Sequence, residues 1–99
     1  MKNLIPNWDK AFENKVRLGI MAILVVNEWV DFNGFKEQLD LTDGNLASHL
    51  NALEKVAYVE VRKSFIGRKP NTSFRATASG KQAFTHHLQS LEKFIQSQL

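Results

Sequence analysis

The spacing of apolar residues in the first third of the chain predicts helices. Val16, Ile20, Ile23 and Leu24 recur with the period of an α-helix, and Asn14 stands where a cap belongs. Other apolar residues of this segment lie on its remaining faces, which predicts burial on more than one side. Before it, the stretch from Pro6 to Phe12 predicts a short first helix.

Shorter elements follow. Residues 29–32 predict a short extended segment, after which Asn33 is placed to cap a short helix that ends at Leu39. In that helix, Phe35 and Leu39 face inward.

A longer helix is predicted from about Thr42 to Val56. Leu46, Leu50, Leu53 and Val56 form one apolar stripe along it, and Thr42 is a good N-cap. The opposite face is small and polar, with Asn45, Ala47, Ser48, Asn51 and Lys55. Short side chains with mixed donors and acceptors suit a helix that enters the major groove of DNA.

The last third predicts a β-hairpin and a terminal helix. Residues 58–65 and 72–77 alternate as strands around a turn at residues 67–71. Thr77 then caps a helix over about residues 78–99, whose apolar residues are spaced as in a coiled-coil seam. This stripe is Phe84, Leu88, Leu91 and Ile95. The order of elements predicts a mainly α fold with a small hairpin wing, a winged helix-turn-helix forming one domain over residues 1–99.

Composition narrows the function. The chain has 99 residues and no cysteine, which removes disulfides and thiolate metal sites. Residues 1–60 carry six basic and nine acidic side chains, whereas residues 61–99 carry seven basic ones and only Glu92. This asymmetry fits either a surface for a polyanion or a solvated basic face, and charge alone does not decide. The absence of a signal peptide or long apolar run predicts a cytoplasmic protein with no membrane contact.

Five motifs in order resemble small winged-helix regulators related to the MarR and ArsR groups. They are Val16 to Ile20, Leu41 to Leu46, His49-Leu50 with Tyr58-Val59, Gly67 to Pro70, and Ala76 to Gly80. The resemblance covers roughly residues 12–96 and implies DNA binding as a dimer. One departure is Ala57, where these families usually have glycine. Alanine is strained in a left-handed helix end, so a different turn is expected there.

Roles follow from the fold and the resemblance. The recognition helix would contact a pseudo-palindromic duplex through Thr42, Asp43, Gly44, Asn45, Ser48 and Asn51. The wing would follow the DNA backbone through Arg62, Lys63, Arg68, Lys69 and Arg75, with Arg68 and Lys69 at its tip. The dimer interface would be the stripe Phe84, Leu88, Leu91 and Ile95, to which Trp8 and Phe12 could add. The simpler alternatives are solvated polar residues on the helix and a basic hairpin that serves only solubility.

Other functions are less well supported by these residues. There is no phosphate loop and no nucleophile–base set, so we predict no catalytic residues and no cofactor. His86 and His87 point about 100° apart on a helix and lack further ligands, which argues against a metal. A winged helix that binds proteins instead of DNA remains the main alternative. A ligand sensor would need its effector at the dimer interface, and nothing in the sequence identifies one.

Overall fold

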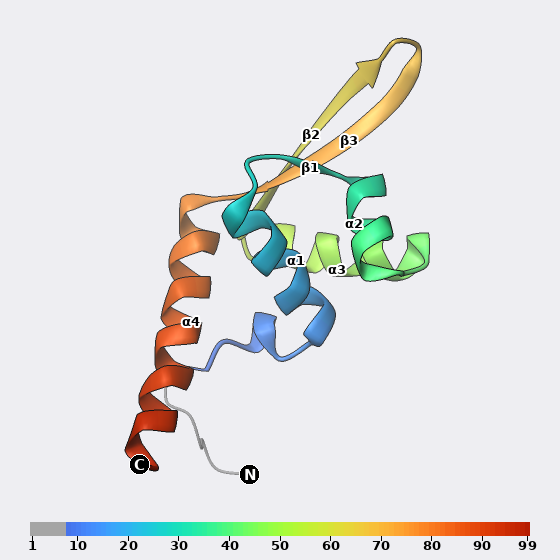
Figure 1. Cartoon of the computed structure of the whole chain (residues 1–99). Helices are drawn as coiled ribbons and strands as arrows, with labels where there is room; N and C mark the ends of the chain where they lie inside the picture. The colour runs from blue at the N-terminus through green and yellow to red at the C-terminus, as the bar shows by residue number, and fades with distance from the viewer. Residues whose placement is uncertain (1–7) are drawn as a thin grey trace.

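The computed structural model describes residues 8–99, in which helices surround a small antiparallel sheet (Figure 1). The elements in chain order are η1 (Lys10–Phe12), α1 (Lys15–Val26), β1 (Val30–Asp31), α2 (Phe32–Leu39), α3 (Asp43–Lys55), β2 (Val59–Ile66), β3 (Lys69–Ala76) and α4 (Ala78–Ser97). The wing β2–β3 and the free end of α4 project from opposite ends of the body (Figure 1). The mainly α winged-helix architecture is confirmed.

Polar side chains cap the helices, which satisfies backbone N–H groups that have no partner inside the helix. Asn14 Oδ1 accepts from the backbone N–H of Val16 at 2.8 Å. Thr42 Oγ1 accepts from Asn45 at 3.2 Å. These two caps and that of Thr77 on α4 are as predicted.

The predicted cap of α2 is wrong. Asp31, not Asn33, caps this helix, because its carboxylate accepts from the backbone N–H of Gly34 at 2.8 Å. Asp31 is also the last residue of β1, so strand and helix follow without a loop. Upstream, the expected helix from Pro6 is in the described part only a 3-10 turn capped by Asp9; Pro6 itself lies outside the described residues.

The core is centred on α1, whose Ile20, Met21 and Leu24 are fully buried. The same cluster contains Phe12, Phe35, Leu46, Leu50, Leu53, Val59, Phe74, Ala76 and Phe84. Burial of α1 on several faces agrees with its sequence pattern. Val56 was expected in the stripe of the following helix, but it lies just beyond the end of α3 and is half-exposed.

The strand order is β1-β3-β2, with both pairings antiparallel. Ile66 pairs with Lys69, so the loop has only two residues, Gly67 and Arg68, instead of the predicted five. Gly67 takes φ +64°, a conformation that favours glycine. Because β1 pairs with β3 only at Phe74 and Ser73, the outer half of the hairpin extends beyond the rest of the sheet.

The end of α3 keeps a left-handed residue despite the missing glycine. Ala57 takes φ +63°, so the expectation of a different turn is wrong. Its N–H donates to the Glu54 carbonyl at 2.9 Å, and the Tyr58 N–H donates to the Leu53 carbonyl at 3.0 Å. These two bonds form a Schellman motif, which satisfies the last carbonyls of the helix.

The start of α4 is bonded to this same turn. Thr77 Oγ1 donates to the Ala57 carbonyl at 2.6 Å, and the Thr77 N–H donates to the Tyr58 carbonyl at 3.0 Å. The close approach requires a glycine one turn later, because a Cβ on Gly80 would lie 2.2 Å from the Tyr58 oxygen. The end of α3 and the beginnings of β2 and α4 therefore form one rigid junction.

A buried histidine joins α4 to the N-terminal segment. His87 is 1% exposed, and its ring lies 3.9 Å from the Trp8 ring and 5.1 Å from Phe12 between centroids. The Asp9 N–H points at its Nδ1 at 3.4 Å. Burial lowers the pKa of His87, and the Asp9 carboxylate opposes this more weakly. Tyr58 donates to Asp9 Oδ2 at 2.6 Å, and this bond with partial burial raises the pKa of Tyr58 to about 12.

Replacing Ala57 with glycine should stabilise the protein by about 1 kcal/mol, because glycine removes the cost of the left-handed conformation. Urea unfolding measures this change. Ala52→Gly in the middle of α3 is the matched control and should destabilise by about 1 kcal/mol. Equal destabilisation by both substitutions would contradict the assigned turn.

The buried His87 should make stability depend on pH. Its pKa is lowered on folding, so the unfolded chain binds the extra proton and stability falls as pH drops below about 6.5. Above that pH the contribution is fully present, and the slope cannot exceed about 1.4 kcal/mol per pH unit for one proton. In the His87→Gln variant, the midpoint of urea unfolding should change less with pH between pH 5 and 7 than in the wild type.

His86 supplies the control, since it is the exposed neighbour on the same helix. His86→Gln should leave the pH dependence of the wild type in place. If His87→Gln keeps the full dependence, another group causes it.

Candidate nucleic-acid interface

One face of α3 presents short polar side chains to solvent. Asn45, Ser48 and Asn51 are exposed and lie opposite the fully buried leucine stripe that attaches the helix to the core. The small Ala47 lies close to them, and the long side chain of this face, Lys55, stands one turn beyond Asn51. This face can therefore approach a surface closely and offer both donors and acceptors.

The first turn of α3 is open. Thr42 caps it, and nothing lies within 4 Å of where a Cβ of Gly44 would be. Packing therefore does not require this glycine. Asp43 pairs with Lys36 of α2 at 2.5 Å across the turn between the two helices. Both side chains are partly exposed to solvent, so this ion pair adds little to the stability of the fold and serves mainly to orient α2 and α3.

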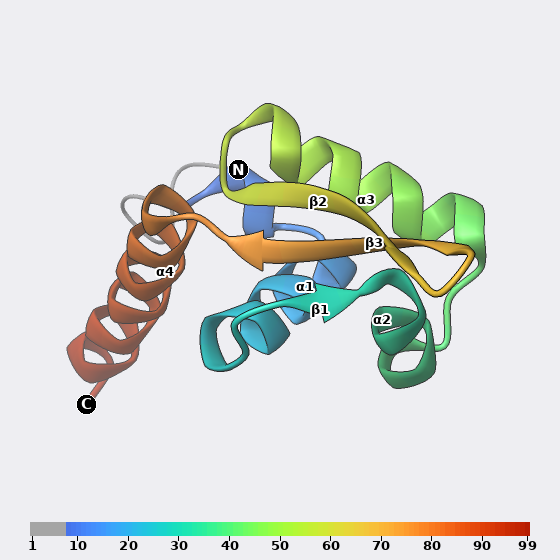
Figure 2. The same ribbon diagram turned by 90° about the horizontal axis from the view of Figure 1, so that it is seen from above.

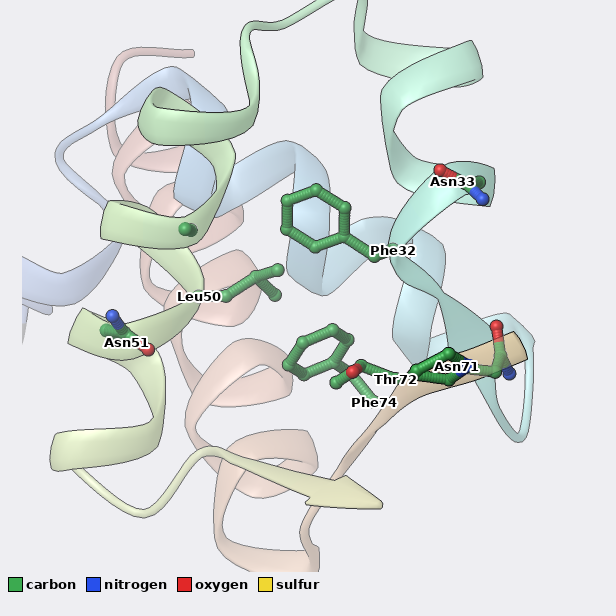
Figure 3. A pocket seen from close by; sticks show the side chains of 9 residues that line it. Phe32, Asn33, Leu50, Asn51, Asn71, Thr72 and Phe74 are labelled. Atoms are coloured by element: carbon green, nitrogen blue, oxygen red, sulfur yellow. The ribbon is translucent and has the colours of Figure 1, made fainter. Parts of the chain in front are cut away.

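A groove of about 390 Å³ separates α3 from the wing. Phe32, Leu50 and Phe74 point towards one another at its floor (Figure 3). Polar side chains from three elements stand around them. The rest of the lining is Asn33, Ala47, Asn51, Pro70, Asn71 and Thr72. The recognition helix and β3 thus border one continuous concave surface.

The five predicted wing cations fall into two groups. Cross-strand pairing puts Lys63 opposite Thr72, on the sheet face that borders the groove, and Arg68 and Lys69 lie at the tip. All three are exposed. These cations are placed to meet a partner that lies across α3 and the wing.

Arg62 and Arg75 are held differently. Their guanidinium carbons lie 4.1 and 4.8 Å from the ring centre of Trp29, and Arg75 also pairs with Glu60. Alternation along the strands places them on the sheet face opposite Lys63. The two arginines hold the hairpin against Trp29, the residue just before β1. They are therefore poorer candidates than Lys63 for a surface that binds DNA.

Sequence reasoning missed several of these residues. The sequence predicts only a short extended segment around Trp29, whereas this ring is the platform for two arginines. Asn33 was assigned to a cap, and Asn71 and Thr72 to the hairpin, yet all three line the groove. The strand register would have revealed Asn71 and Thr72, because they pair with Ser64 and Lys63.

The predicted apolar stripe on α4 is partly buried and partly exposed. Phe84 is buried in its own protomer, with its ring edge-on to Phe12 at 5.7 Å, so it does not form part of an exposed seam. Leu88 and Ile95 are 46% and 52% exposed, and Leu91 is half-buried. Of the predicted interface residues, these three remain available to a second molecule.

The third histidine of the chain, His49, lies on α3 and faces inward. His49 is half-buried, and its Nδ1 lies 3.5 Å from Nη1 of Arg17. Within residues 8–99, no three His, Asp or Glu side chains are grouped to hold a metal ion. Over the same residues, the helices are too short or too polar to cross a bilayer.

Comparison with known proteins agrees with this geometry. The profile of the family described as winged helix DNA-binding domain matches residues 16–95. The chain belongs to this family. An uncharacterized protein of Methanocaldococcus jannaschii is 42% identical over 79 residues, which are 80% of this chain and 86% of the relative.

Solved structures extend the comparison. A transcriptional regulator homologue from Pyrococcus horikoshii is 36% identical, with a TM-score of 0.80 over 88% of this chain and 86% of that chain. A MarR-like transcription regulator from Bacillus cereus shares the fold at 19% identity, with a TM-score of 0.70 over 95% and 70% of the two chains. Membership of the winged-helix DNA-binding family is confirmed, the resemblance to MarR-like proteins is one of fold, and DNA is the partner that the family's description names. Family and fold are those of transcriptional regulators rather than enzymes.

Proposed function

We propose that the chain is one winged-helix unit that binds duplex DNA at a preferred sequence, as a homodimer, and so regulates transcription. The observation that carries the proposal is the shared surface of α3 and the wing. Asn51 of α3 lines one side of the groove, with Asn45 and Ser48 exposed earlier on the same helix, and Lys63 with the basic tip lies on the other side. Residues 61–91 contain no acidic side chain to repel DNA there.

Each part of this surface suits a different part of the duplex. The α3 face is narrow enough for the major groove, where an asparagine side chain matches the donor and acceptor of adenine. The open N-terminal turn at Gly44 suits a phosphate, since unpaired backbone N–H groups and the helix dipole favour an anion. The wing then lies along the flanking backbone, where its cations displace counterions. Affinity comes mainly from the wing, and sequence preference mainly from α3.

The homodimer rests on the outer part of α4. Leu88 and Ile95 expose apolar surface on a 20-residue helix, about 30 Å long, that projects from the body (Figure 1). Pairing two such helices would remove this surface from water and place two copies of α3 on one side. Symmetric recognition helices fit a pseudo-palindromic site with half-site centres about 10 base pairs apart.

Asn51→Ala should cost about 1–3 kcal/mol for each half-site of the preferred site and much less on random duplex, because a base contact is lost while the phosphate contacts remain. The preferred site is first selected from a random duplex library. Titrations of labelled DNA at several salt concentrations then measure both affinities.

Lys63→Ala is the matched variant for the wing. It should weaken binding to both DNAs alike and lower the log–log salt slope by about 0.9 for each protomer, or about 1.8 for the dimer. Uniform loss from Asn51→Ala would assign Asn51 to the backbone instead. If the wild type binds no duplex, the chain is a winged helix with another partner.

Leu88→Asp with Ile95→Asp should convert the dimer to a monomer in sedimentation at tens of micromolar, because two carboxylates would be buried without partners. Both sites are half-exposed, so the fold should survive. Val26→Asp, at the 79% exposed end of α1, is the control and should remain dimeric. A monomeric wild type, or a dimeric double variant, would exclude α4 as the interface.

A further inference from the structure

The tip of the wing exposes large apolar side chains beside its cations. Phe65 is 71% exposed and Ile66 is 65% exposed, next to the two-residue loop of Gly67 and Arg68. We propose that this tip is a wedge for the minor groove, in which Phe65, with Ile66 on the other face of the hairpin, presses on a base step and bends the duplex. The inference rests on the proposed function and adds a second, wing-borne source of sequence preference.

The hairpin itself gives these residues no structural role. Phe65 pairs with Pro70 and Ile66 with Lys69, at the end of the wing beyond the part that β1 covers. Neither Phe65 nor Ile66 belongs to the core cluster or packs against it. A wing that only touched phosphates would need cations here, and two bulky apolar groups would add a cost in solubility.

The charge around the wing tip and its position beside α3 both indicate that DNA is the partner that binds there. Arg68 and Lys69 adjoin the apolar pair, and Lys63 follows on the same strand. Alternation puts Phe65 on the sheet face of Lys63 and Thr72, the face that borders the groove beside α3. Phe65 is therefore continuous with the proposed DNA surface, whereas the exposed seam of α4 lies at the other end of the molecule (Figure 1).

Dimensions favour the minor groove. Seen from above, the wing lies beside α3 (Figure 2), and in the side view its outer half rises away from that helix (Figure 1). With α3 in the major groove, a projecting hairpin reaches the neighbouring minor groove, which is about 6 Å wide. A two-residue loop in which only Arg68 carries a side chain fits that width, whereas a helix does not. Arg68 at its end suits the negative potential of a narrow A·T-rich groove.

An apolar wedge has a defined effect on DNA. Inserted side chains partly unstack a base step and bend the duplex by about 20–90°. Pyrimidine–purine steps such as TA unstack most easily, so the wing would prefer them without any hydrogen bond to a base. The preference would lie outside the bases that α3 contacts.

The test uses the full-length protein and the selected site, with either a TA or an AA step under the wing. 2-Aminopurine at that step reports unstacking, and energy transfer between end labels reports bending. The wild type should raise the fluorescence, bend the duplex, and bind the TA duplex several-fold more tightly than the AA duplex. Phe65→Ser with Ile66→Ser should abolish all three effects and lower affinity about tenfold.

Val26→Ser is the matched control, since it also removes an exposed apolar side chain, at the end of α1 and not on the wing, and should behave as the wild type. The double variant should have the melting temperature and the oligomeric state of the wild type. Adding Asn51→Ala to it should lower its affinity for the selected site as much as that substitution does in the wild type. The wedge is excluded if the double variant unstacks and bends DNA normally, or if it changes the oligomeric state, which would make the tip a contact between copies. A wild type that binds its site without unstacking also excludes the wedge and leaves the proposed function intact. Failure of the wild type to bind any duplex would overturn the proposed function itself.

Discussion

The arrangement of the molecule depends on the close contact between the backbone of Tyr58 and the first turn of α4. Tyr58 ends the Schellman turn of α3 and immediately precedes β2, and its carbonyl accepts from Thr77 at 3.0 Å. Gly80 must lack a side chain for this contact, since a Cβ would lie 2.2 Å from that carbonyl oxygen. One junction therefore fixes the recognition helix, the wing and the proposed dimer helix relative to one another. Only glycine at position 80 permits all three at once.

Side chains extend this constraint in two directions. The Tyr58 hydroxyl bonds to Asp9, and the segment that carries Asp9 packs on His87, so the N-terminal end of the described chain attaches to α4. On the outer sheet face, Trp29 is covered by two guanidinium groups that come from β2 and β3. The base of the hairpin is thereby held on both faces, by the core and by this stack. Rigidity at the base leaves the distal pairs free of packing, where cations and apolar groups can serve binding alone.

Much of this fold can be predicted from the sequence because its signals are local. Helix periodicity, the caps Asn14 and Thr42, and the alternation in the hairpin all act over a few residues. Errors arose where a local signal had a competitor. Asn33 is a good capping residue, but Asp31 is placed two residues earlier and reaches Gly34 first. At Ala57 the junction with Thr77 offsets the cost of a left-handed alanine, and no local pattern shows that distant partner.

The candidate site was predictable to the same degree. The polar face of α3 follows from its periodicity, so the exposure of Asn45, Ser48 and Asn51 could be predicted. The wing cations were treated as one set because charge along a strand does not reveal which face each side chain takes. Register separates Lys63 from Arg62, and only the fold shows that Trp29 occupies the second face. Phe84 was misplaced for a related reason, since periodicity defines a stripe on α4 but not how far the protomer's own core, here Phe12, covers it.

These constraints also bear on how two protomers would meet one DNA. In each protomer, α3 and α4 are joined through the Tyr58 junction, so they cannot rotate independently without breaking its bonds. The contact of α4 with a second copy would therefore set the separation of the two recognition helices, and hence the spacing of half-sites that both can reach. The buried His87 lies between this junction and the exposed part of α4. Its ring packs on Trp8 and Phe12, so it holds the N-terminal segment against α4 beside the proposed interface.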